Sequence, residues 1–246
     1  MLALVPILLI LMVFIFNASP HNVISQNSQI SQKIQEISQD IRLQQYDSAI
    51  SAADSVLAAD PVNKYALFYK GEAIRLKGQP EEALKYFDRV LEIDPEYASA
   101  WDQKGWAFNS LEQWQDAIDA FDKGIEYGGE SSTSSHWYGK GIALARLGQD
   151  DEALSAFRTA LQKNSTKYET YTQIGKIYLK RGEYQDAHNE FVKTIQGNPG
   201  YADAWWSDAK VLEKLGDHQN ATLALSRAIS LDPLKYSTRT LADNTT

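Results

Sequence analysis

The chain has 246 residues, a formal net charge of −8 at pH 7 and no cysteine. This acidic balance, without a basic stripe, disfavours non-specific binding to nucleic acid. The absence of cysteine excludes disulfides, thiolate catalysis and zinc sites with cysteine ligands. The apolar content of 43% would suit one or two globular domains.

The chain begins with an unbroken apolar run over residues 2–16. As a helix the run would reach roughly 22 Å at ~1.5 Å per residue, short of the ~30 Å hydrocarbon core of a bilayer. No Lys or Arg precedes it, and Phe16-Asn17-Ala18 is a poor signal-peptidase site. We therefore assign residues 1–18 to an uncleaved single-pass membrane anchor, with a cleaved signal peptide and a cytosolic chain as the alternatives.

Four Asn-x-Ser/Thr sequons permit N-glycosylation and favour an extracytoplasmic position for the region that comes after the anchor. Chance explains them equally well, because the chain is rich in Ser, Thr and Asn. The sequons begin at Asn17, Asn164, Asn220 and Asn244.

A polar stretch over residues 19–29 is rich in Ser, Asn and Gln and predicts a linker. Ile30, Ile34, Ile37 and Ile41 then recur at helical spacing. A coiled coil normally needs about three heptads, and this segment holds fewer. We therefore expect the first helix of an incomplete capping repeat, with a short coiled coil as the alternative.

From residue 30 to residue 233, one unit of two short helices recurs. An alanine marks the second helix of each copy, at intervals of 34, 34, 36, 34 and 34 residues by subtraction: Ala49, Ala83, Ala117, Ala153, Ala187 and Ala221. A large apolar residue stands four positions later in five copies, at Phe87, Phe121, Phe157, Phe191 and Leu225. The first helix carries a small residue, which lets the two helices cross closely, at Gly71, Gly105, Gly141, Gly175 and Ala209.

These residues resemble the tetratricopeptide repeat (TPR), whose 34-residue W-x2-L-G-x2-Y…A-x3-F…P signature they match. The resemblance implies an all-α superhelical solenoid of antiparallel helix pairs over residues 30–233, with about five full units after an incomplete first one. Charged residues replace the leucine that precedes the small residue, at Lys70, Lys104, Lys140 and Asp208.

The turns and the two irregular ends of this region carry further predictions. Left-handed helix C-caps are expected at Gly78, Gly148, Gly182 and Gly216. Two extra residues fall in the loop at 128–135, as a surface insertion or, alternatively, a hinge. Residues 234–246 form a short tail in which Leu234, Thr238 and Leu241 could make a helical stub; otherwise the last helix face is partly exposed.

No catalytic, cofactor or metal site is expected. The four histidines lack another His, Cys or carboxylate at metal-ligand spacing on a shared face. Acidic pairs open second helices, where carboxylates complement the helix dipole. The sequence therefore predicts that the protein is not an enzyme.

In TPR proteins the first helices line a concave groove that takes an extended or helical peptide, and the resemblance implies the same here. Projecting the period onto positions between the core residues places four residues of each of five first helices on the groove side, Asp203 among them. Ten of these are the candidate groove residues: Tyr65, Phe68, Glu72, Trp106, Asn109, Tyr138, Lys176, Lys180, Trp206 and Lys210. The aromatic residues Phe68, Trp106, Tyr138 and Trp206 either anchor a partner or pack against neighbouring helices.

The charges of this groove predict its preference. The family's terminal-carboxylate clamp uses Lys and Asn, and the matching early slots here hold Phe68, Glu72, Asp102 and Trp106 instead. Lys176, Lys180, Lys210 and Lys214 would form a basic patch further along. We predict a membrane-tethered, non-catalytic scaffold that binds a partner protein's peptide or helix. A self-associating structural component and an extracytoplasmic glycan binder are the alternatives.

Overall fold

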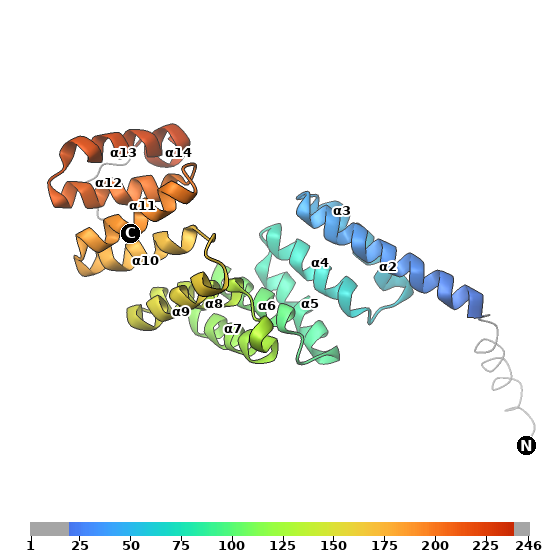
Figure 1. Ribbon diagram of the computed structural model, residues 1–246. Coiled ribbons are helices and arrows are strands. Elements are labelled where there is room, and N and C mark those ends of the chain that lie inside the picture. The colour runs from blue at the N-terminus through green and yellow to red at the C-terminus, as the bar shows by residue number, and fades with distance from the viewer. Residues whose placement is uncertain (1–19, 239–246) are drawn as a thin grey trace, which may run out of the picture. The chain divides into compact units, whose positions relative to one another are not determined.

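The computed structural model describes residues 20–238, with side chains from residue 28 onward (Figure 1). Over these residues it contains thirteen α-helices, one short 3₁₀ helix and no β-strand, which confirms the predicted all-α fold. The chain divides into two compact units, Met1–Pro95 and Glu96–Thr246. The predicted anchor at 1–18 and the sequons at Asn17 and Asn244 lie outside the described residues. Across 20–238, no helix combines the length and apolarity needed to cross a membrane.

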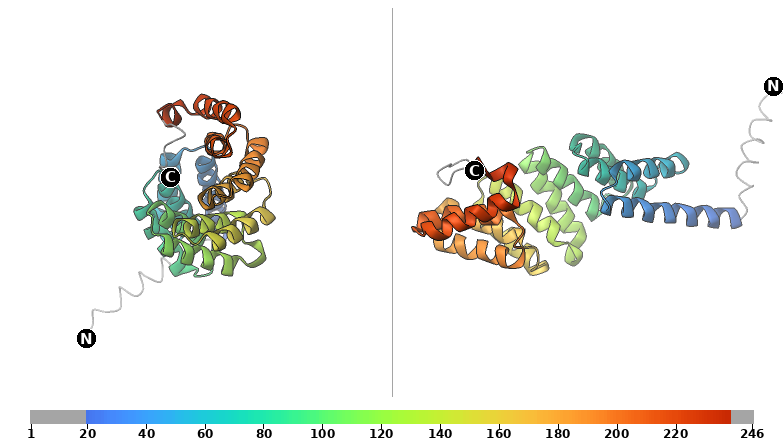
Figure 2. Two further views of the ribbon diagram at one scale, coloured as in Figure 1. Left: turned by 90° about the vertical axis from the view of Figure 1, so that its left-hand side faces the viewer. Right: turned by 90° about the horizontal axis from the view of Figure 1, so that it is seen from above.

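The first unit contains α2 (Pro20–Arg42), α3 (Tyr46–Ala59), α4 (Lys64–Leu76) and α5 (Pro80–Ile93). The helix α2 begins at Pro20, so the stretch expected to be a linker is helical from that residue onward (Figure 2). Proline is favoured at the first position of a helix, and the stretch continues directly into the isoleucine stripe of α2. Buried residues of that stripe pack against α3, as expected for the first helix of an incomplete repeat.

The second unit continues the same alternation of first and second helices. Consecutive helices within it pack against one another. The first helices are α6 (Ala98–Ser110), α8 (Ser134–Arg146), α10 (Glu169–Arg181) and α12 (Ala202–Leu215). The second helices are α7 (Trp114–Gly128), α9 (Asp150–Lys163), α11 (Tyr184–Gly197) and α13 (His218–Leu231), with the short helices η1 (Gly129–Ser131) and α14 (Pro233–Tyr236) beside them.

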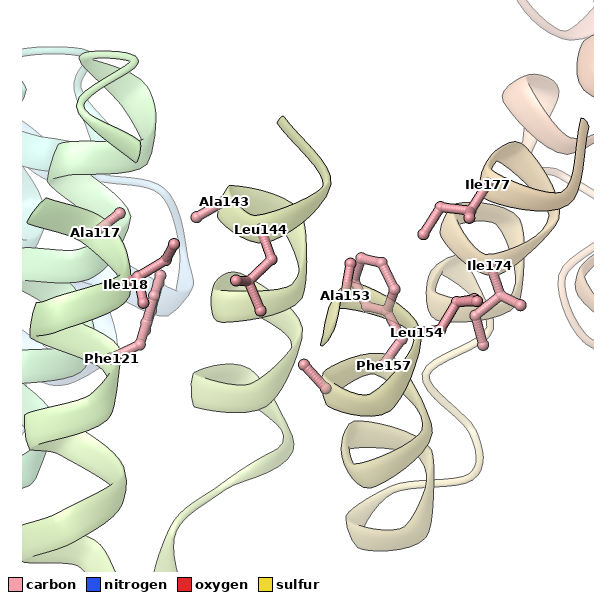
Figure 3. Close-up of a cluster of buried hydrophobic side chains, with 11 residues drawn as sticks. Ala117, Ile118, Phe121, Ala143, Leu144, Ala153, Leu154, Phe157, Ile174 and Ile177 are labelled. Carbon is pink, nitrogen blue, oxygen red and sulfur yellow. The ribbon is translucent and has the colours of Figure 1, made fainter. Parts of the chain in front are cut away.

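The glycine of each first helix lies against the phenylalanine of the second helix. Phe157 is fully buried, and a Cβ atom built on Gly141 would lie 2.6 Å from its ring. Figure 3 shows Phe157 with Ala153 and Leu154 on α9, facing Ile174 of the next helix. The same approach recurs at the other three glycines of this series, so the predicted close crossing is confirmed.

The turns between paired helices use a left-handed residue. The four glycines expected in this role have φ angles of +77° to +89°, which confirms the prediction. The corresponding positions of the two glycine-free turns are Gln44 and Glu112, with φ angles of 60° and 58°. A residue with a Cβ atom is disfavoured in the left-handed region of the backbone angles. The conformation of these two turns must therefore be held by the packing of the helices that they join.

Three of the four charged residues that replace the family's leucine have partners in the preceding second helix. Lys70 on α4 lies 2.5 Å from Asp54 on α3, and Lys140 on α8 pairs with Asp122 on α7. In the last copy the polarity is reversed, because Asp208 on α12 faces His188 on α11 at 2.6 Å. At these three positions the departure from the TPR signature is therefore matched by a partner in the preceding second helix.

Candidate interaction face on the first helices

In the first unit, the three predicted groove residues of α4 have different environments. Tyr65 is 49% exposed, whereas Phe68 is only 7% exposed. The Phe68 ring lies 5.2 Å from that of Tyr69 and 6.4 Å from that of Phe87. Phe68 is thus a packing residue, which was the alternative interpretation, and Tyr65 and half-buried Glu72 are the accessible members.

In the second unit, Trp106 joins α6 to α8. Its ring packs on Phe121 and Tyr138 at centroid distances of 5.6 and 6.0 Å. Its indole N–H donates to Ser135 Oγ at 3.0 Å, and that hydroxyl donates to Asp102 Oδ2 at 3.2 Å. Trp106 is therefore half-buried and held on several sides, with only part of its surface left for a partner.

Asn109 and Tyr138 make further contacts between elements of the second unit. The side-chain amide of Asn109 donates to the carbonyl oxygen of Gly139 at 3.1 Å. The Lys167 ammonium lies 4.4 Å from the centroid of the Tyr138 ring. Burial raises the pKa of Tyr138 to about 12, and the nearby carboxylates Glu169 and Asp203 add to the shift. Tyr138 is therefore a neutral hydrogen-bonding group at physiological pH.

Asp203, at the start of α12, is the centre of a charged cluster. Lys235 Nζ lies 2.6 Å from Oδ1, the Tyr236 hydroxyl donates to the same carboxylate, and Lys176 Nζ lies 3.9 Å from Oδ2. Burial alone would raise the pKa of Asp203, but the hydrogen bonds from Lys235 and Tyr236 and the charge of Lys176 together lower it. Sequence reasoning placed Asp203 on the groove side of this helix but did not predict its contacts, because its partners come from α10 and from the tail.

Both cations of this cluster are accessible, since 42% of the Lys176 side chain and 44% of the Lys235 side chain are exposed. Lys176 is the more distant of the two from the Asp203 carboxylate. Partial burial lowers its pKa despite the opposing effect of Asp203. Lys180 instead pairs with Asp150 of α9 at 2.9 Å. Two of the four lysines predicted as one basic patch, Lys176 and Lys180, thus lie beside different carboxylates, so this part of the face carries mixed charge.

Trp206 is covered by the tail of the chain. The Tyr236 ring of α14 stacks on it at a centroid distance of 5.2 Å, and the two residues are 8% and 1% exposed. The predicted open anchor at Trp206 is therefore wrong. The stub expected after residue 233 is present as α14, but Tyr236 and not Leu234 turns inward, since Leu234 is 97% exposed.

Three polar side chains of the second unit, His136, Asp102 and Ser135, lie close together. His136 Nδ1 lies 3.7 Å from Asp102 Oδ1, and both residues are buried. The Ser135 hydroxyl donates to Asp102 and not to the histidine, so the three groups do not form a nucleophile activated by a base. In the described part of the chain, no group of three or more His, Asp or Glu side chains is placed to hold a metal ion.

Helix pairs of about 34 residues, with small residues against aromatic rings at each crossing, define an α-helical repeat protein. The tetratricopeptide repeat pattern matches residues 40–98, 103–168 and 172–235, which together exceed half of the chain. The chain belongs to the tetratricopeptide repeat family, a family of protein–protein interaction scaffolds. The match indicates no class of enzyme.

The first curated relatives match only part of this chain. Protein O-mannosyl-transferase TMTC2 from Homo sapiens is 26% identical over 109 residues, which are 43% of this chain and 13% of that protein. The chain spans only 13–16% of the first three curated relatives.

Two solved structures have the same fold. PilW, a widely conserved type IV pilus biogenesis factor, superposes with a TM-score of 0.75 at 22% identity, covering 83% of this chain and 94% of that chain. YrrB, a TPR protein with an unusual peptide-binding site, gives 0.57 at 23% identity, covering 74% and 93%. These likenesses concern the fold.

Proposed function

We propose that the protein is a non-catalytic scaffold that binds a peptide or helix of a partner protein on the first helices of its second unit. The proposed surface runs along α6, α8, α10 and α12. It includes the accessible parts of Trp106, Asn109, Tyr138 and Lys176, together with Asp203. The family match and the solved TPR structure described as peptide-binding support this type of partner.

The observation that carries the proposal is the state of Lys176. Its side chain is 42% exposed, its ammonium nitrogen lies 3.9 Å from Asp203 Oδ2, beyond hydrogen-bond distance, and burial lowers its pKa. A partner carboxylate would gain from this charge more than from a fully hydrated lysine, because the surrounding protein lowers the local dielectric. Tyr138 adds an aromatic ring, a residue type enriched among binding hot spots.

The test is crosslinking of the intact protein in its own membranes, followed by recovery of the crosslinked partner. Lys176→Glu should reduce the recovered partner roughly tenfold or more, because a charge pair becomes a repulsion. Lys123→Glu is the matched control, since Lys123 is 47% exposed but lies on the second helix α7. Equal recovery from both variants at unchanged melting temperature would contradict the proposed surface.

We further propose that the N-terminal apolar run tethers this scaffold to a membrane. The supporting observation is the unbroken apolar run at residues 2–16 of the sequence, which precedes the helix that begins at Pro20. The full chain should sediment with membranes, and a chain without residues 1–16 should be soluble and folded. Recovery of the full chain from a soluble fraction with Met1 intact would contradict the tether.

A further inference from the structure

Two of the four sequons lie within the described residues, and their backbones differ. Asn164 is the residue that ends α9, with φ −150° and ψ 96°, and it begins the loop to α10. Asn164, Ser165 and Thr166 are all exposed. Asn220, in contrast, lies in the first turn of α13. A glycosylation acceptor is expected in a surface loop, so only Asn164 has the expected setting.

The side-chain amide groups of Asn164 and Asn220 also make different hydrogen bonds. At Asn164 the side-chain oxygen accepts hydrogen bonds from the backbone N–H of Thr166 at 3.0 Å and from its hydroxyl at 2.8 Å. The two side chains that define the sequon therefore share one exposed turn. At Asn220 it is the nitrogen that is engaged, because Nδ2 donates to Asp217 Oδ2 at 2.7 Å. That nitrogen is the atom that would have to react.

The surroundings of Asn164 leave room for a sugar. Asn164 lines an open pocket of about 730 Å³ between the α9–α10 loop and the loop that carries the two-residue insertion. Its other lining groups include the side chains of Ser132, Thr133, Lys163 and Lys167. Hydroxyl and ammonium groups can donate hydrogen bonds to the oxygens of a saccharide. The irregular loop thus supplies a polar surface next to the acceptor.

We propose that Asn164 is an N-glycosylation site and that Asn220 is not. The donor is a lipid-diphosphate-linked oligosaccharide. Asn164 Nδ2 forms a bond to the anomeric carbon of the first sugar and loses one proton to a base of the transferase. The bond from that carbon to the diphosphate oxygen breaks, and the electron pair leaves with the lipid diphosphate. No oxidant or reductant takes part.

The proposal requires that the second unit leaves the cytoplasm, which is the position that the sequons favour. Digestion of intact cells with an added protease decides that point separately. The intact protein is then purified from its own cells, and two peptides are analysed by mass spectrometry. Cleavage after glutamate gives residues 153–169, which contain Asn164, and tryptic cleavage gives residues 215–227, which contain Asn220.

We expect the 153–169 peptide to carry a mass increment of whole sugar residues and the 215–227 peptide to carry none. Thr166→Ala should abolish the increment, and Thr166→Ser should keep it because the hydroxyl is retained. Thr222→Ala should leave the modification unchanged. Circular dichroism checks that each variant is folded. An unmodified 153–169 peptide overturns the proposal, whether or not the protein is exported, and a modified 215–227 peptide overturns the distinction between the two asparagines.

Discussion

The repeats α8–α9 and α12–α13 solve one packing problem with different side chains. In α8–α9, Gly141 leaves space for the Phe157 ring, and an added Cβ atom would come within 2.6 Å of it. In α12–α13, Ala209 carries that Cβ atom, and the smaller Leu225 stands in place of the phenylalanine and packs beside it. The two facing residues therefore vary as a pair. The methyl group that Ala209 adds is matched by the loss of the phenylalanine ring.

The two repeats also differ in the element that covers each of them on the C-terminal side. The repeat α8–α9 is covered by α10, whose Ile174 and Ile177 join its hydrophobic cluster. In the part of the chain that the structure describes, the repeat α12–α13 is followed by the single turn α14, which places Tyr236 over Trp206. One aromatic ring thus covers part of a surface that a complete helix would otherwise cover.

The largest difference in stability between the two repeats should appear when the large residue of the second helix, Phe157 or Leu225, is replaced by alanine. Phe157→Ala should lower the free energy of unfolding by ~3–5 kcal/mol, because a fully buried ring leaves a cavity. Leu225→Ala should cost less, near the lower end of ~2–5 kcal/mol, because Leu225 is only partly buried. Urea unfolding followed by circular dichroism measures both. A loss below about 1 kcal/mol for Phe157→Ala would mean that the helix pairing is misassigned.

The next largest loss of stability should come from removing the Tyr236 ring that covers Trp206. Tyr236→Ala should lower the free energy of unfolding by roughly 2–3 kcal/mol, since it removes a buried ring and an aromatic contact. Tyr236→Phe keeps the stacked ring and should cost less. Leu234→Ala is the control from the same turn and should be nearly neutral, because Leu234 is 97% exposed. If Tyr236→Ala also leaves the unfolding curve unchanged, α14 does not stabilise the last repeat.

The exchange of small and large residues can be tested directly in α8–α9. Gly141→Ala should cost ~1–3 kcal/mol by overpacking against Phe157. Combining it with Phe157→Leu recreates the Ala209–Leu225 pair, so the double variant should be more stable than the sum of the single losses predicts.

The control for this cycle is Gly200→Ala. A Cβ atom there would meet only Asn198 Oδ1, at 3.5 Å. This substitution should therefore have little effect on the melting temperature. Strictly additive losses at positions 141 and 157 would show that the two residues do not form one packing unit.

Sequence reasoning reached the architecture because its signals are local and repeated. The glycine, alanine and phenylalanine positions follow helical spacing, and each was found at the predicted crossing. The start of α2 at Pro20 was missed, because a polar stretch that extends an existing helix lacks an apolar stripe of its own.

The candidate site was predicted less well, for a physical reason. The period places a residue on a helix face, but it does not reveal what covers that residue from another element. Trp206 was assigned to an open face, and only the structure shows Tyr236 folded over it from 30 positions later by subtraction. Asp203 was placed on the same face, but its contacts were not predicted, since the side chains that bind it come from distant positions.

The smallest expected effect distinguishes two aspartates of α12. Hydrogen bonds from Lys235 and Tyr236 overcome the effect of burial and lower the pKa of Asp203 below 3.8. Burial raises the pKa of Asp208 above 3.8, and contact with His188 only partly opposes the shift. Asp203 therefore contributes stability that is present above pH 3.8 and is lost as pH falls through its folded pKa. Asp208 contributes stability that is full below pH 3.8 and is lost as pH rises through its folded pKa.

Asparagine substitutions should expose these opposite signs, because asparagine resembles the protonated acid. Near neutral pH, Asp203→Asn should lower the melting temperature relative to the natural protein, and Asp208→Asn should raise it. Below pH 3.8 both differences should shrink, since the natural carboxyl groups become protonated as well. Melting curves across this pH range provide the measurement. If both substitutions shift the melting temperature in the same direction at neutral pH, the His188–Asp208 contact stabilises the last repeat more than burial of the Asp208 charge destabilises it.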